Sequence, residues 1–99
     1  MVKIIMTWDI QENKEKEYID FAVNELSPTL GALGLQISDV WYTVIGGGPE
    51  MVVSGLMPDR TDALELLQSR DWLQLKRRLV EFVEHVSVKV VKPSGPFQM

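Results

Sequence analysis

Few side chains in this sequence have the chemistry expected of a catalytic or metal-binding group. His85 is the only histidine, and an imidazole can act as a general base or a metal ligand near neutral pH. It follows Glu81 by four residues and lies next to Glu84, close to the end of a predicted helix. A basic side chain at that position also interacts favourably with the helix dipole. A metal ion needs more ligands than this group offers, so we predict no metal site.

Aromatic side chains form the second group of candidates. Tryptophan occurs three times in 99 residues, at positions 8, 41 and 72. Large aromatic rings pack in cores and interfaces, and they also line ligand pockets, which are mainly apolar. We predict a site for a small apolar or aromatic molecule, and the residues we assign to it are Trp8, Tyr42, Trp72 and His85.

Composition disfavours several other chemistries. The chain contains no cysteine, which excludes disulfides and thiol chemistry. Its net charge is −4, whereas binding to nucleic acid or to an anionic membrane needs clustered basic residues. The basic triplet 76–78 is followed by acidic residues and predicts a solvated helix face. The glycine triplet 46–48 lacks the Lys-Ser/Thr ending of a phosphate-binding loop and predicts a hairpin turn. We therefore expect no nucleic-acid partner and no membrane partner.

The hydrophobic pattern predicts the elements that must position these residues. Alternating apolar residues and β-branched or aromatic runs indicate four strands, over residues 2–8, 35–45, 50–57 and 86–91. A first helix begins near Asp9–Asn13, where either side chain could cap it, and ends by Gly34. It bends or restarts at Ser27-Pro28. Two further helices are predicted over 60–68 and 70–85, because the apolar stripe is interrupted at Ser69.

The predicted element order is βαββαβ, the ferredoxin-like α+β arrangement with a four-stranded antiparallel sheet. We assign it to one domain over 1–92, followed by a C-terminal tail over 93–99. Both helical regions cover the same face of the sheet. The other face also carries apolar residues, and exposed apolar patches of that size mark interfaces. We predict that a second copy of the chain covers this face through a two-fold axis.

The sequence resembles the dimeric α/β-barrel superfamily, which includes small antibiotic-biosynthesis-type monooxygenases, haem-degrading monooxygenases and many members of unknown role. The features that carry the resemblance are the element order, Pro28-x-Leu30 before Gly34, Trp41-Tyr42, and Ser69-x-x-Trp72. The resemblance implies a homodimer that forms a barrel. Haem-degrading members use an asparagine, a tryptophan and a histidine. Trp72 and His85 match two of these types, but the first strand carries Thr7 and Asp9 and no asparagine, so we expect no haem and no other cofactor.

Three functional hypotheses follow. The first is a non-catalytic homodimer that binds a small apolar or aromatic molecule. The second, implied by the resemblance, is a cofactor-free monooxygenase acting on an aromatic or polyketide-like substrate, for which the polar candidates are Thr7, Asp9, Tyr42 and His85. The third is an amino-acid-sensing domain of the ACT type, which shares the strand order. We expect a cytoplasmic protein, because Asp9 closes the N-terminal apolar run too early for a signal peptide.

Overall fold

The computed structural model describes residues 1–92. Its elements are β1 (Val2–Ile10), α1 (Glu15–Phe21), a π-helical segment η1 (Ala22–Leu26), α2 (Ser27–Ala32), β2 (Gln36–Tyr42), β3 (Met51–Met57), α3 (Arg60–Gln68), α4 (Arg70–Leu79) and β4 (Val83–Val91). The predicted βαββαβ order is confirmed. The C-terminal tail predicted over 93–99 lies outside the described residues.

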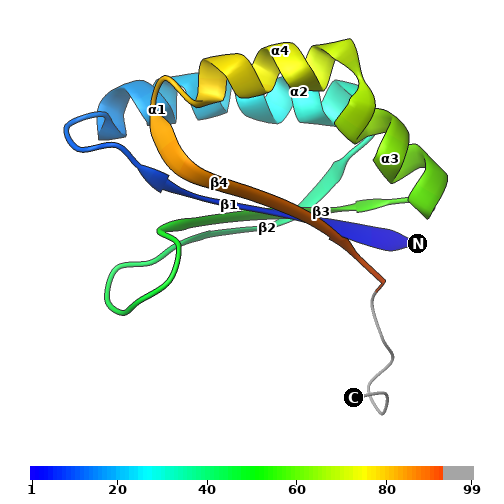
Figure 1. Ribbon diagram of the computed structural model, residues 1–99, viewed down its shortest axis with the longest axis horizontal. Coiled ribbons are helices and arrows are strands. Elements are labelled where there is room, and N and C mark those ends of the chain that lie inside the picture. Colours follow the sequence, from blue (N-terminus) through cyan, green and yellow to red (C-terminus); the bar gives the residue numbers. More distant parts are fainter. Residues whose placement is uncertain (93–99) are drawn as a thin grey trace.

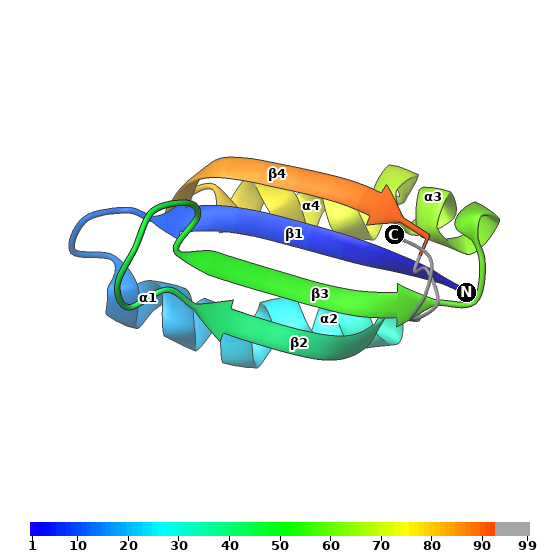
Figure 2. The same cartoon turned by 90° about the horizontal axis from the view of Figure 1, so that it is seen from below.

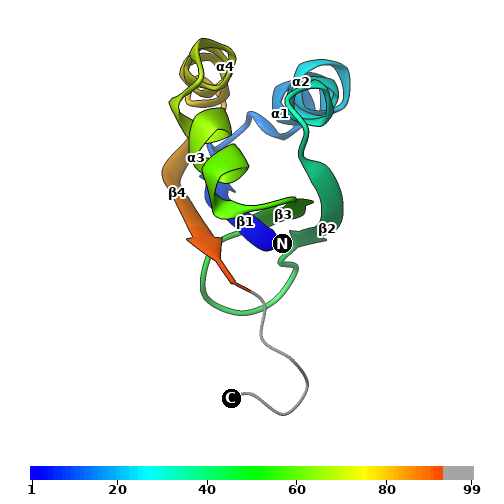
Figure 3. The ribbon, with the colours of Figure 1, turned by 90° about the vertical axis from the view of Figure 1, so that its right-hand side faces the viewer.

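The four strands form one antiparallel sheet in the order β2-β3-β1-β4, as Figure 2 shows from below. All helices lie against one face of this sheet (Figures 1 and 3), as predicted. No helix of residues 1–92 covers the opposite face, which we call the open face. Among residues 1–92, no helix is both long and apolar enough to cross a membrane.

Strand β1 shows the alternation that the sequence predicted. Ile4, Met6 and Trp8 are fully buried beneath the helices, while Ile5 and Thr7 point to the open face and are only half-buried. Successive side chains of a strand point to opposite faces, so one period-two pattern places apolar groups in the core. β1 runs two residues beyond the predicted end at residue 8.

A β-bulge changes the side-chain register of β4. Val83 is buried and Val86 packs against the same core, although the two are three positions apart and not two or four. The pairing between β1 and β4 shifts between Thr7 and Asp9, which leaves an extra residue on β4. His85 lies in this bulge with a φ of 59°, a left-handed conformation that is uncommon outside glycine.

Two predicted helix ends are wrong. α4 ends at Leu79 and not at residue 85, because β-branched Val83 and Val86 belong to the sheet; His85 is therefore a strand residue. α1 begins at Glu15 with Lys14 at its N-cap and no side-chain cap. Asp9 does not cap α1, since β1 continues through it to Ile10.

The predicted break at Ser27-Pro28 appears as the junction between η1 and α2. Pro28 is the second residue of α2, which continues η1 in helical conformation, so its missing N–H interrupts the helical hydrogen bonding at this junction. The Ser27 N–H bonds to the carbonyl of Ala22, the i→i−5 bond of a π-helix. α2 ends at Ala32, and Gly34, two residues later, has a φ of 99°. The Leu35 N–H donates to the Leu30 carbonyl, which completes a Schellman motif.

Candidate functional site

An apolar pocket lies between the first helical layer and strands β2 and β3. Its cavity volume is about 200 Å³. The wall from the helices and strands consists of Tyr18, Ile19, Ala22, Val23, Leu26, Ser27, Leu30, Ile37, Val40, Met51 and Val53. No charged residue lines it. An ionised ligand would leave its charge without a counter-ion here, so the pocket suits a neutral molecule.

The π-helical segment keeps one wall of this pocket aligned. Tyr18, Ala22, Leu26 and Leu30 follow one another at four-residue steps and all line the pocket. In a regular α-helix, four residues turn through about 400°, so such a row drifts by about 40° at each step. The wider i→i+5 turn of η1 counteracts this drift. Short π-helical segments inside helices occur frequently at functional sites.

The pocket opens at the β2 edge of the sheet. β2 is an edge strand, and its Val40 remains 59% exposed. Across the pocket, Ile19 and Val23 on the helical layer are 56% and 66% exposed. These three apolar side chains therefore border the mouth and leave it accessible to a small molecule.

Trp8 and Tyr42 flank the pocket without lining it. Both pair with Met51 in the sheet register, so Trp8, Met51 and Tyr42 form one row on the helix-facing side. Trp8 is buried and donates a hydrogen bond of 3.1 Å from Nε1 to the Tyr18 hydroxyl. Tyr42, at the end of the edge strand, is 55% exposed. Two of the four residues assigned to a ligand site thus lie beside this pocket.

The other two predicted residues, Trp72 and His85, lie elsewhere. Trp72 is buried in the first turn of α4. Its backbone N–H donates to Ser69 Oγ at the break between α3 and α4. His85 is on β4, at the opposite edge of the sheet from β2. The four side chains do not converge on one cavity. Sequence analysis did not assign Tyr18 to a site, because its four-residue spacing to Ala22 is ordinary helical spacing and does not mark a pocket wall.

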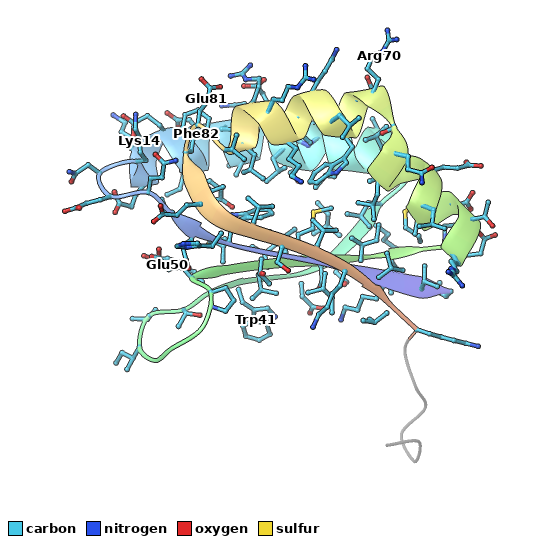
Figure 4. The ribbon with its side chains drawn as sticks, in the orientation of Figure 1. Lys14, Trp41, Glu50, Arg70, Glu81 and Phe82 are labelled. Atoms are coloured by element: carbon cyan, nitrogen blue, oxygen red, sulfur yellow. The ribbon has the colours of Figure 1, made fainter. Side chains whose placement is uncertain are left out.

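His85 belongs to a small polar cluster at the end of β1. Its Nδ1 lies 2.9 Å from Asp9 Oδ2, and Asp9 Oδ1 accepts the Glu50 backbone N–H at 2.9 Å. In return, Glu50 Oε1 accepts the Ile10 N–H at 3.0 Å. Figure 4 shows Glu50 at this end of the sheet, where the loop after β2 returns. The two hydrogen bonds between Glu50 and β1 hold the end of that loop against the strand. Among the described residues, no group of three or more His, Asp or Glu side chains could hold a metal ion.

The Asp9 cluster predicts a specific pH dependence of stability. The Glu50 N–H, followed by the hydrogen bond from His85, holds the pKa of Asp9 below its usual 3.8. A carboxyl whose pKa is lower in the folded state stabilises the fold above the unfolded pKa, and this contribution is lost as pH falls through the folded pKa. Between about pH 6 and about pH 3, Asp9→Asn should therefore lose less stability than the wild type. Urea unfolding at each pH measures this, with Asp20→Asn on exposed α1 as the control. Equal acid sensitivity of Asp9→Asn and wild type would contradict the assignment.

The open face combines an apolar end with a polar centre. Trp41, Val52 and Thr7 form one row across β2, β3 and β1, and Trp41 is 64% exposed. Figure 4 shows its ring on the side away from the helices. At the centre of the face, Asp39 and Ser54 form the row that pairs with Ile5. Asp39 Oδ2 accepts a hydrogen bond of 3.0 Å from Lys3 Nζ, and the hydroxyl of buried Ser54 donates to the same oxygen. Lys3 and Asp39 are therefore already paired within the chain, whereas Lys89, in the same row as Asp39 at the β4 edge, forms no ion pair with residues 1–92.

Solved structures share this fold. An uncharacterized NIPSNAP domain protein from Burkholderia xenovorans aligns with a TM-score of 0.73 and 17% identity over 100% of this chain and 99% of its own. A Dabb family protein with a ferredoxin-like fold from Mesorhizobium loti gives 0.73 and 16% identity over 95% and 97%. Rv0793 from Mycobacterium tuberculosis gives 0.72 and 19% identity over 98% of both chains. No protein-family model and no curated protein matches the sequence. The likeness establishes a ferredoxin-like α+β fold and confirms the predicted resemblance at that level.

Proposed function

We propose that this chain forms a cytoplasmic homodimer that binds a small, neutral apolar or aromatic molecule. The observation that carries the binding role is the apolar pocket between the η1 wall and strands β2 and β3. Ligand sites are typically concave and mostly apolar, and this one has an exposed mouth and a π-helical wall. The lack of cysteine in the sequence fits a reducing compartment.

The pocket volume limits the size of the ligand. An engineered apolar cavity of about 150 Å³ binds benzene, whereas pockets for drug-sized ligands measure about 300–1,000 Å³. A volume of about 200 Å³ therefore suits a single ring or a short branched chain. A polycyclic molecule would extend through the mouth past Val23 and Val40.

The alternative function is a cofactor-free monooxygenase acting on an aromatic or polyketide-like substrate. Such a reaction needs a base within hydrogen-bond reach of the proton that it removes. The oriented imidazole in the described residues is His85, held by Asp9, and neither residue lines the pocket. Binding without catalysis is the better-supported role.

The open face supports the assembly part of the proposal. It exposes Trp41 beside half-buried Val52 and Leu56. Its central pair, Lys3 and Asp39, is already satisfied within the chain, so a second copy could cover the face without stranding these charges. A two-fold axis would place the same face of each copy against the other, as a closed dimer requires. We therefore propose that the open face of a second copy of this chain covers the open face of the first.

Filling the pocket tests the binding role. Ala22 is half-buried on the pocket wall, and Ala22→Phe would occupy much of the space available to a ligand. Cumene (isopropylbenzene) is a suitable neutral probe. We expect wild-type protein to bind cumene and Ala22→Phe to bind it at least about tenfold more weakly, since tenfold corresponds to about 1.4 kcal/mol. NMR titration measures both affinities.

Ala32→Phe is the matched control, because Ala32 is exposed on α2 and does not line the pocket. It should bind cumene as the wild type does. Absence of cumene binding to the folded wild type would refute the binding role, and so would equal affinities of wild type and Ala22→Phe.

A further inference from the structure

We propose that Lys89 of one chain forms an ion pair with Asp39 of a second copy, and that the two-fold axis of the dimer therefore runs parallel to the strands. This inference rests on the proposed dimer and specifies how its two open faces meet. Two-fold symmetry repeats every contact, so the dimer contains this ion pair twice. Lys89 is then the residue that fixes the orientation of the partner.

The first support is a row of four residues across the middle of the open face. From β2 to β4, this row consists of Asp39, Ser54, Ile5 and Lys89. Asp39 and Lys89 thus lie on the same face at opposite edges of the sheet, three strand spacings apart. At about 4.8 Å per spacing, their separation is about 14 Å, which is too far for an ion pair within one chain.

The second support is the charge of Lys89. This side chain is exposed and forms no ion pair with residues 1–92. A charge that enters an interface without a partner is costly, so a second sheet over this face must supply a carboxylate. The neighbouring rows, which pass through Thr7 and through Lys3, contain no acidic residue. Asp39 is therefore the carboxylate that the second copy offers at this level of the sheet.

The third support is the second oxygen of Asp39. The hydrogen bonds from Lys3, Ser54 and Ser38 all reach Oδ2, and within residues 1–92 no donor reaches Oδ1. An ionised carboxylate has about four lone-pair sites on its two oxygens, so Oδ1 can accept an ammonium group from a second chain. The bond from Lys3, followed by those from the two serines, holds the pKa of Asp39 below its usual 3.8. The carboxylate is therefore charged at neutral pH.

The fourth support is the symmetry of a closed dimer. β2 and β4 are the two edges of the sheet (Figure 2). A two-fold axis parallel to the strands, through the middle of the row, places β4 of one copy over β2 of the other. Lys89 then faces Asp39 of the second copy at both edges. An axis across the strands instead places β4 over β4 and β2 over β2, so that like charges meet, which is destabilising.

Reversing the charge at position 89 tests the ion pair. Lys89→Glu would place like charges opposite each other twice in each dimer, so we expect the dissociation constant to rise at least about tenfold. Lys89→Arg keeps the charge and should stay within about twofold of the wild type. Lys76→Glu is the matched control, because it changes the net charge equally at an exposed position of α4; its dissociation constant should also stay within about twofold. Sedimentation equilibrium measures all four proteins.

Cross-linking of the wild type keeps the test valid if a variant does not fold. A water-soluble carbodiimide joins a lysine amine directly to a carboxylate that contacts it. Chains labelled with ¹⁴N and with ¹⁵N are mixed, allowed to exchange and cross-linked, and mass spectrometry identifies the linked peptides. We expect a link between Lys89 and Asp39 in which the two isotopes are combined. The link between Lys3 and Asp39 forms within one chain, so it should never combine them and serves as the internal control.

The outcomes separate the orientation from the dimer itself. If the wild type is a dimer but gives no link between Lys89 and Asp39, the dimer stands and the proposed orientation is wrong. The same conclusion follows if Lys89→Glu dissociates no more readily than Lys76→Glu. If the wild type is a monomer, the dimer fails and the orientation fails with it. A mixed-isotope link together with selective weakening by Lys89→Glu supports both.

Discussion

Trp72→Ala should lower the free energy of unfolding by about 3–5 kcal/mol, the usual cost of truncating a buried tryptophan. Trp72 is 3% exposed and its backbone N–H is bonded to Ser69 at the break between α3 and α4. Removing the ring leaves a cavity where the second helical layer changes direction. A small domain has a total stability of about 5–15 kcal/mol, so the loss is a large fraction. Urea unfolding followed by circular dichroism measures it.

Leu73→Ala provides the matched control, since Leu73 is the next residue of α4 but is 48% exposed. Its substitution should cost much less than that of Trp72. Trp72 does not line the pocket, so a folded Trp72→Ala protein should still bind cumene. A Trp72→Ala protein as stable as Leu73→Ala would contradict the structural role of this ring.

Trp41→Glu should weaken the proposed dimer by about 100-fold or more. Tryptophans buried in an interface often contribute at least about 2 kcal/mol, and a two-fold axis brings two copies of the substitution into each dimer. Each glutamate would also bury a charge without a partner. Trp41 is 64% exposed within one chain, so the fold of the protomer should tolerate the change. Sedimentation equilibrium at several protein concentrations gives the dissociation constants.

Leu64→Glu is the control for this experiment. Leu64 is an apolar residue of α3 that is 41% exposed, on the helical side and away from the open face. The Leu64→Glu substitution should leave the dissociation constant of the dimer unchanged. If Trp41→Glu and wild type dissociate equally, or if Leu64→Glu is as disruptive, the open face is not the interface.

The sequence predicts the fold well where one period dominates. The alternation from Val2 to Trp8 assigned the buried face of β1 correctly, and Ser69 marked the break between α3 and α4. The end of α4 could not be predicted in the same way. Leu79 and Val83 continue a four-residue helical spacing, yet the chain has already turned into β4. Only pairing with β1, a long-range contact, distinguishes the two states of this segment.

The candidate site was predictable only in part. Trp8 and Tyr42 were chosen as aromatic residues, and both lie in one row with Met51 beside the pocket. Tyr18 was not assigned to the site, and the bond between its hydroxyl and Trp8 joins a helix to a strand. Such a bond follows from tertiary packing and not from spacing along the chain. The bulge that redirects His85 has the same origin, because it depends on the register between β1 and β4.

The molar mass of the wild-type chain in solution tests the dimer through the open face most directly. Size exclusion coupled to light scattering at micromolar concentration should give twice the 11.3 kDa mass of one chain, because a second copy covers Trp41 and its neighbours. A uniform mass of 11.3 kDa across the eluting peak would show that the open face stays uncovered, and it would contradict the proposed assembly.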